Sequence, residues 1–124
     1  MPEPLSILIV EDMEDLRDLL QRLLMSRGYH VICVGTAEEA LREAALAPIH
    51  LLLTDWQLPG MNGRDLALQL MASHPGLKIL LTSGQLQTGL GDLEWLKDKG
   101  VYLTKPYDFD VMFEALARLS AKAA

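Results

Sequence analysis

The sequence predicts an α/β fold: a doubly wound, five-stranded parallel sheet with helices on both faces. Two observations support this prediction. Five short apolar runs alternate with five longer stretches, as they do in a succession of strand–helix units. The runs show little polar alternation, which is typical of strands buried on both faces of a parallel sheet. At 124 residues, of which 50% are hydrophobic and 23% charged, the chain suits one compact domain.

The strands are expected where the apolar runs lie. The third run shows the pattern most clearly, because its leucines are soon followed by the turn residues Pro59 and Gly60. The five predicted strands are Ser6–Val10, His30–Val34, Leu51–Thr54, Lys78–Thr82 and Val101–Thr104.

The first two helices have clear end signals. The first is predicted over about Met13–Arg27, with Gly28 as its stop. Thr36, with Glu39 three residues later, forms a capping box that begins the second helix, and Pro48 ends it. The predicted apolar stripes are Leu16, Leu19, Leu20, Leu23 and Leu24 in the first helix, and Ala37, Ala40, Leu41 and Ala44 in the second.

The remaining three helices differ in strength. The third is expected to begin near Asn62 or Gly63 and to stop before Pro75, and the fifth begins at Asp108, a favoured N-cap residue. The fourth is the weakest, because two glycines interrupt its start and few apolar residues follow. Its residues are Gly89 and Gly91, then Leu93, Trp95 and Leu96; the inner face of the fifth is Val111, Met112, Ala115, Leu116 and Leu119.

Composition excludes several classes of protein. The formal net charge is −6, from 17 acids and 11 bases, and the bases are scattered, which argues against nucleic acid as a direct partner. The apolar runs are far shorter than the roughly 20 residues of a membrane span, so no membrane insertion is expected. The N-terminus lacks a secretory signal, and a cytoplasmic protein is the expectation. The one cysteine, Cys33, lies in an apolar run and reads as an inert core thiol.

Three acids follow two of the predicted strands. Asp55 comes directly after the third strand, and Glu11 and Asp12 directly after the first. In a doubly wound sheet of order 2-1-3-4-5 these strands are neighbours, so their carboxylates meet at the carboxyl edge, where such sheets bind ligands. Like charges at close range are unfavourable unless a cation compensates them. Mg²⁺ is the natural candidate, because it prefers oxygen ligands. Taken alone, Glu11 and Asp12 would most simply cap the first helix.

A lysine and a hydroxyl follow the last two strands. Lys105 leaves the fifth strand at the same edge, where it can pair with Asp55 and then with a phosphoryl oxygen. Thr82 or Ser83 ends the fourth strand and can donate to such an oxygen, with the small Gly84 beside it. This set suits phosphoryl transfer onto a carboxylate, in which Asp55 is the nucleophile and the other groups neutralise charge.

Four motifs together resemble the receiver domains of bacterial two-component response regulators. They are Ile9-Val10-Glu11-Asp12, Leu53-Thr54-Asp55-Trp56-Gln57-Leu58-Pro59-Gly60-Met61-Asn62-Gly63, Thr82-Ser83-Gly84 and Tyr102-Leu103-Thr104-Lys105-Pro106. The resemblance spans about residues 5–120 and implies a single receiver domain over residues 1–124. It also implies a flavodoxin-like (βα)5 fold with strand order 2-1-3-4-5.

The resemblance assigns roles to the acids. Asp55 would be the phosphoacceptor in a domain that catalyses its own phosphorylation and dephosphorylation and is otherwise not an enzyme. Mg²⁺ would be bound by the side chains of Asp12 and Asp55 and by the backbone carbonyl of Gln57. Glu11 would act mainly through a metal-bound water.

The resemblance also assigns the polar groups around the acids. Lys105 would contact the phosphoryl group, and its bond to Pro106 would be cis. Of the two hydroxyls, Ser83 is chosen over Thr82, because it precedes a small residue and lies about 22 positions before the lysine, as in the family. Tyr102 would be the aromatic residue that responds to phosphorylation.

The implied partners are a sensor histidine kinase or a histidine phosphotransfer protein. The signalling surface would comprise the fourth helix, fifth strand and fifth helix, through which a homodimer could also form. The chain departs from the family here, since the segment Gly100-Val101-Tyr102 is two residues shorter than usual. The length and start of the fourth helix therefore stay open, as does whether the domain stands alone or comes from a hybrid kinase.

Three other functions fit the sequence less well than a receiver does. A phosphatase or dehalogenase of the haloacid dehalogenase type would want an acid two residues after Asp55, where the sequence has Gln57. A pseudo-receiver that only docks partners lacks support, since every phosphorylation residue is present. A dinucleotide-binding role lacks the glycine motif after the first strand. Gln57 and Gln85 are instead expected to tune the lifetime of the acyl phosphate.

Overall fold

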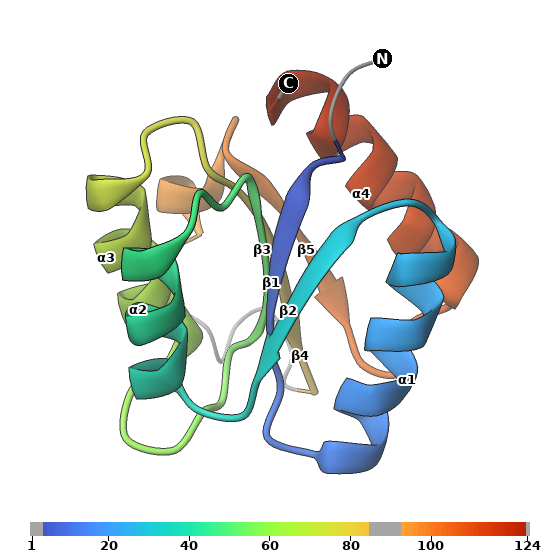
Figure 1. Ribbon diagram of the computed structural model, residues 1–124, viewed down its shortest axis with the longest axis horizontal. Helices are drawn as coiled ribbons and strands as arrows, with labels where there is room; N and C mark the ends of the chain where they lie inside the picture. Colours follow the sequence, from blue (N-terminus) through green and yellow to red (C-terminus); the bar gives the residue numbers. More distant parts are fainter. Residues whose placement is uncertain (1–3, 85–92, 124) are drawn as a thin grey trace.

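The computed structural model describes residues 4–84 and 93–123. A central sheet lies between two layers of helices, with α2 and α3 on one face and α1 and α4 on the other (Figure 1). This arrangement confirms the predicted α/β fold. The described α-helices are α1 (Glu14–Ser26), α2 (Ala37–Leu46), α3 (Gly63–Ser73) and α4 (Phe109–Ala123).

The sheet has five parallel strands in the order β2-β1-β3-β4-β5, as expected. All five predicted strands are present, and their ends differ from the prediction by one residue in three cases. The strands are β1 (Ser6–Val10), β2 (His30–Val34), β3 (Leu51–Asp55), β4 (Lys78–Ser83) and β5 (Gly100–Thr104).

The central strands are apolar throughout because each serves two cores. In β1, Ile7 and Ile9 pack toward α1 and α4, whereas Leu8 and Val10 pack toward α2 and α3. All four side chains are 0–1% exposed. Alternate residues of a strand point to opposite faces, so a strand covered on both faces needs apolar residues at every position.

The predicted helix caps form. The Thr36 hydroxyl accepts from the Glu39 N–H at 3.2 Å and donates to the Glu39 carboxylate at 3.1 Å, which completes the capping box. The Asn62 side chain accepts from the Asp65 N–H at 2.8 Å and so begins α3. The Asp108 carboxylate accepts a backbone N–H at 2.7 Å at the start of α4.

Two residues predicted to face the core do not. Leu19 of α1 is 36% exposed and Val111 of α4 is 48% exposed. Each lies one position before a fully packed residue, Leu20 or Met112, and successive helix residues are 100° apart around the axis. The apolar stripes were therefore predicted slightly too wide.

The predicted fourth helix is only partly covered by the structure. Gly89 and Gly91 lie outside the described residues. The described part of this segment contains a short 3₁₀ helix, η2 (Glu94–Leu96), followed by a turn in which Asp98 has a φ of 65°. This turn leads directly into β5, so the chain reverses where a longer helix would have continued.

Candidate functional site

The three predicted acids converge at the carboxyl edge of the sheet. β1 pairs with β3, and Val10 lies opposite Thr54, so the residues that follow them emerge side by side. One carboxylate oxygen from each of Glu11, Asp12 and Asp55 lies within 4.8 Å of the others. These three carboxylates are called the acid cluster below. The topology thus brings together groups that are more than 40 residues apart in the sequence.

Lys105 forms ion pairs with two members of the acid cluster. Its ammonium Nζ lies 3.0 Å from Glu11 Oε1 and 3.0 Å from Asp55 Oδ2. The Lys105 N–H donates to the Ser83 carbonyl at 2.7 Å, which fixes the chain as it leaves β5. The peptide bond to Pro106 is cis, as expected. One positive charge therefore compensates two of the three carboxylates directly.

Burial and the ion pair with Lys105 have opposite effects on the pKa of Glu11. Glu11 is 3% exposed, and this burial raises the pKa of its carboxyl above the ordinary 4.5. The Met13 N–H, which donates to Glu11 Oε2 at 3.1 Å, and the Lys105 ammonium act in the opposite direction. Burial alone would lower the pKa of Lys105, but its bonds to Glu11 and Asp55 outweigh this and raise the pKa above 10.5. Burial thus disfavours the charged form of Glu11, and the Lys105 ammonium and the Met13 N–H offset part of that effect.

The loop after β3 is folded closely around Asp55. The Trp56 N–H donates to the Thr82 carbonyl and the Gly63 N–H to the Trp56 carbonyl, both at 2.7 Å. A Cβ on Gly63 would lie 2.4 Å from the Asp55 carbonyl oxygen, so only glycine lets α3 begin this close to the site. The Gln57 N–H also donates to Asp55 Oδ1 at 3.3 Å. These contacts fix the Asp55 carboxylate in place.

The two hydroxyl candidates occupy different positions at the end of β4. Thr82 lies opposite Asp55 in the strand register, and its buried hydroxyl donates to the Thr54 carbonyl at 3.5 Å. Ser83 is the last residue of β4, lies opposite Thr104 and is fully buried. Both residues lie at the edge that carries the acid cluster.

The other predicted residues are Gln57, Gln85 and Tyr102. Gln57 is exposed, and Gln85 lies outside the described residues. Tyr102 is half-buried against the α2–α3 core, and its hydroxyl accepts from the Thr104 hydroxyl at 3.4 Å.

Two residues at this edge were missed from the sequence. Arg17 Nη1 donates to the Glu11 carbonyl at 3.0 Å. Tyr107 lies with Lys105 in the lining of a cavity of about 340 Å³, and burial raises the pKa of its phenol. Nothing in local sequence spacing signals either role. Only the position of Arg17 beside Leu16, early in a helix that starts at the acids, could have drawn attention to it.

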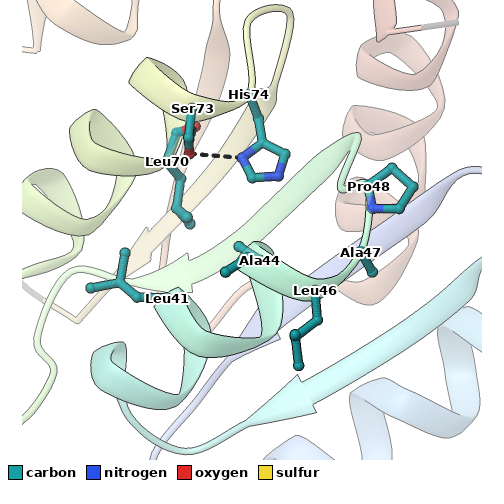
Figure 2. Close-up of a pocket in the computed structure, with 9 residues that line it drawn as sticks. Leu41, Ala44, Leu46, Ala47, Pro48, Leu70, Ser73 and His74 are labelled. Atoms are coloured by element: carbon teal, nitrogen blue, oxygen red, sulfur yellow. Dashed lines mark hydrogen bonds between the residues drawn. The ribbon is translucent and has the colours of Figure 1, made fainter.

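A larger cavity lies near the opposite ends of the strands, and its lining is very different. It measures about 510 Å³ and is formed by the last turns of α2 and α3 (Figure 2). We call it the α2–α3 groove. The Ser73 hydroxyl and His74 Nδ1, 2.9 Å apart, are its polar pair. Its lining is Leu41, Ala44, Ala45, Leu46, Ala47, Pro48, Leu70, Ser73 and His74.

Comparisons with known proteins all identify the same family. The model of the response regulator receiver domain matches residues 7–117. The sensory transduction protein RegX3 of Mycolicibacterium smegmatis is 37% identical over 118 residues, which are 94% of this chain and 49% of that protein. The response regulator receiver protein CpdR of Brucella abortus is 35% identical over 102 residues, 82% of this chain and 84% of that protein.

Solved structures agree with the sequence relatives. A sensor protein from Polaromonas sp. JS666 superposes with a TM-score of 0.85 at 29% identity, covering 99% of this chain and all of that one. The response regulator TrrA of Thermotoga maritima, in complex with Mg²⁺ and BeF, gives a TM-score of 0.80 at 28% identity over 93% of this chain and 98% of that one. The chain spans about half the length of RegX3. Within the described residues, no helix has the length and apolar character needed to cross a membrane.

Proposed function

Because this chain belongs to the response regulator receiver domain family, a family of signalling domains, we propose that it accepts a phosphoryl group on Asp55. The donor would be a phosphohistidine on a histidine kinase or phosphotransfer protein, the partners with which receiver domains act. One observation carries the proposal: the acid cluster and the Lys105 ammonium meet at the carboxyl edge of the sheet. The sequence alone had led to the same residues.

The acid cluster suits Mg²⁺ as the cofactor. Asp12 is exposed and Asp55 is half-buried, so both can offer an oxygen to a cation, together with the Gln57 carbonyl. Glu11 is already engaged by Lys105 and the Met13 N–H, which favours a role through a metal-bound water. When bound, Mg²⁺ would supply positive charge against the phosphoryl oxygens.

The chain's own residues would carry the transfer. An Asp55 oxygen forms the new bond to phosphorus, the bond from phosphorus to the donor nitrogen breaks, and its electron pair leaves with the donor imidazole. Lys105 exchanges its contact with Asp55 Oδ2 for a phosphoryl oxygen, and the Ser83 hydroxyl donates to another. The same groups would serve hydrolysis of the acyl phosphate, so the domain would catalyse its own phosphorylation and dephosphorylation.

Phosphorylation would then change the signalling surface. The phosphoryl group adds about −1.5 to −2 charge. We expect Ser83 to move toward it and Tyr102 to turn inward, which would reshape the surface formed by the segment before β5, by β5 and by α4. A second copy of the chain is a candidate partner for this surface. The net charge of −6 disfavours direct binding of nucleic acid.

The test is phosphorylation by a small acyl phosphate in the presence of Mg²⁺. We expect Asp55→Asn to incorporate no phosphate, because the amide is not a nucleophile, while its circular dichroism stays unchanged. Asp65→Asn, at an exposed carboxylate in the first turn of α3, is the matched control and should label like the wild type. Equal labelling of Asp55→Asn and the wild type would refute the assignment.

A further inference from the structure

We infer that Arg17 is a positioning residue for the metal site, because it holds the Glu11 carbonyl and thereby orients the peptide that carries Asp12. This inference rests on the proposed function, since it concerns how the acid cluster is kept ready for Mg²⁺. Nothing in the predicted set of site residues includes Arg17. Its role is to act through the backbone, without touching the cation or the phosphoryl group.

The backbone of Glu11 is tied on both sides. Its N–H donates to the Val34 carbonyl at 3.1 Å, which extends the pairing of β1 with β2 by one residue. Its carbonyl accepts from Arg17 Nη1 at 3.0 Å. Arg17 belongs to the first turns of α1, where its N–H donates to the Met13 carbonyl at 2.9 Å. The β1–α1 turn is therefore closed by its own helix.

The guanidinium fits because the next loop leaves space for it. A Cβ on Gly35 would lie 2.9 Å from Arg17 Nη1, too close for an undisturbed contact. Gly35 has no positive φ, so only space limits a side chain there, and the flexible Arg17 guanidinium would have to shift to admit one. Within residues 4–84 and 93–123, the guanidinium has no carboxylate within 4.0 Å. Its hydrogen bond to the Glu11 carbonyl is thus its main polar contact.

The tether matters because the Asp12 side chain is exposed and not held by the packing of the core. Asp12 is exposed, and it lies beside two other carboxylates that repel it. The peptide group between Glu11 and Asp12 sets the direction of the Asp12 side chain, and the Arg17 bond fixes that peptide group. A binding site whose ligands are held in place before the ion arrives loses less entropy on binding.

Two explanations of the role of Arg17 predict changes of opposite sign in the Mg²⁺ affinity when the residue is replaced. If Arg17 acted mainly through its positive charge, removing it would strengthen Mg²⁺ binding, since like charges repel. If Arg17 positions Asp12, removing it would weaken Mg²⁺ binding. A purely structural Arg17 would lower the melting temperature and leave the Mg²⁺ affinity unchanged. The sign of the change in affinity therefore separates the three cases.

The experiment is a Mg²⁺ titration of the folded, unphosphorylated protein, followed by the fluorescence of its two tryptophans, one of which is Trp56 beside the site, well below the melting temperature. We expect Arg17→Met, which keeps most of the aliphatic stem, to raise the Kd for Mg²⁺ about tenfold, the size usual for groups that orient metal ligands. Arg17→Lys should recover part of the affinity. Gly35→Ala should act like Arg17→Met, because the methyl group displaces the guanidinium. Arg22→Met, at an exposed arginine of α1, is the matched control.

The outcomes distinguish this inference from the proposed function. A wild type that binds Mg²⁺ while Arg17→Met binds equally well or more tightly would overturn the positioning role alone. A wild type that binds no Mg²⁺ at the acid cluster would overturn the proposed function as well. Weaker binding in Arg17→Met and Gly35→Ala, with Arg22→Met unchanged, supports the positioning role.

Discussion

The acid cluster and the α2–α3 groove lie at opposite ends of the strands of one sheet, and their chemistry differs. The groove is large, about 510 Å³, and its lining is mostly aliphatic (Figure 2). The acid cluster gathers three carboxylates, and the Lys105 ammonium lies within ion-pair distance of two of them. The proposed site therefore rests on the chemistry of the converging groups and not on the volume of a cavity.

The topology explains the difference. In a parallel sheet all carboxyl ends meet at one edge, so the residues after β1, β3, β4 and β5 are brought together there from across the sequence. The groove instead lies where α2 and α3 end, and two of its lining residues belong to the core: Ala44 is 5% exposed and Leu70 is 2% exposed. We therefore expect substitutions in the groove to change stability, and substitutions in the acid cluster to change chemistry.

The largest effect on stability is expected from Leu70→Ala in the groove wall. Deleting this buried side chain should lower the free energy of unfolding by about 2–5 kcal/mol, measured by urea titration. Labelling of Asp55 per folded molecule should stay at the wild-type rate. Leu46→Ala is the control, because Leu46 lines the same groove but is 80% exposed and should cost less than about 0.5 kcal/mol. If labelling per folded molecule also fell in Leu70→Ala, the groove and the acid cluster would not be independent.

Asp12→Asn is expected to change stability less than Leu70→Ala does, and in the opposite direction, while it weakens Mg²⁺ binding. Removing one of three crowded negative charges should raise the free energy of unfolding without Mg²⁺ by about 0.5–1 kcal/mol, while the Mg²⁺ affinity falls about tenfold or more. Asp18→Asn, at an exposed carboxylate of α1, should change the Mg²⁺ affinity little. If Asp12→Asn destabilised the metal-free protein instead, the acid cluster would not be a site of electrostatic strain.

A third expected effect is a pH dependence due to Glu11. Its pKa is raised above 4.5 by burial, so the folded state binds this proton more tightly than the unfolded state. The free energy of unfolding should therefore fall as pH rises from 4.5 through the raised pKa of Glu11, by about 1.4 kcal/mol for each tenfold difference in proton affinity.

Glu11→Gln tests this dependence directly. Urea titrations without Mg²⁺ should show a smaller decrease across that pH interval in the variant than in the wild type, since the amide does not titrate. The same decrease in both proteins would mean that Glu11 does not carry the effect. At pH values above 10.5, loss of the Lys105 charge should destabilise both proteins.

The sheet and the acid cluster could be predicted because both follow from periodicity and topology. Apolar runs fix the strands, and Asp55 and Lys105 meet because strand ends share an edge. Side-chain direction on the helices was less predictable, as Leu19 and Val111 show, because a helix stripe has no sharp boundary.

Arg17 was not predictable for a different reason. Its contact joins a side chain to the Glu11 carbonyl, and its fit depends on the absence of a Cβ at Gly35. Every residue type has a backbone carbonyl, so the sequence does not reveal which carbonyl accepts a hydrogen bond. From the sequence alone, a glycine that leaves space for a neighbouring side chain cannot be told from a glycine in a turn. Such contacts emerge only when three segments, β1, α1 and the end of β2, are placed together.

The most direct test is to locate the phosphoryl group chemically. Treating the protein with Mg²⁺ and a small acyl phosphate, then with borohydride, converts an aspartyl phosphate to homoserine, which peptide mass spectrometry can assign. We expect homoserine at position 55 only when Mg²⁺ and donor are both present. Homoserine at another position, or a label on a hydroxyl or imidazole that resists borohydride, would contradict the account.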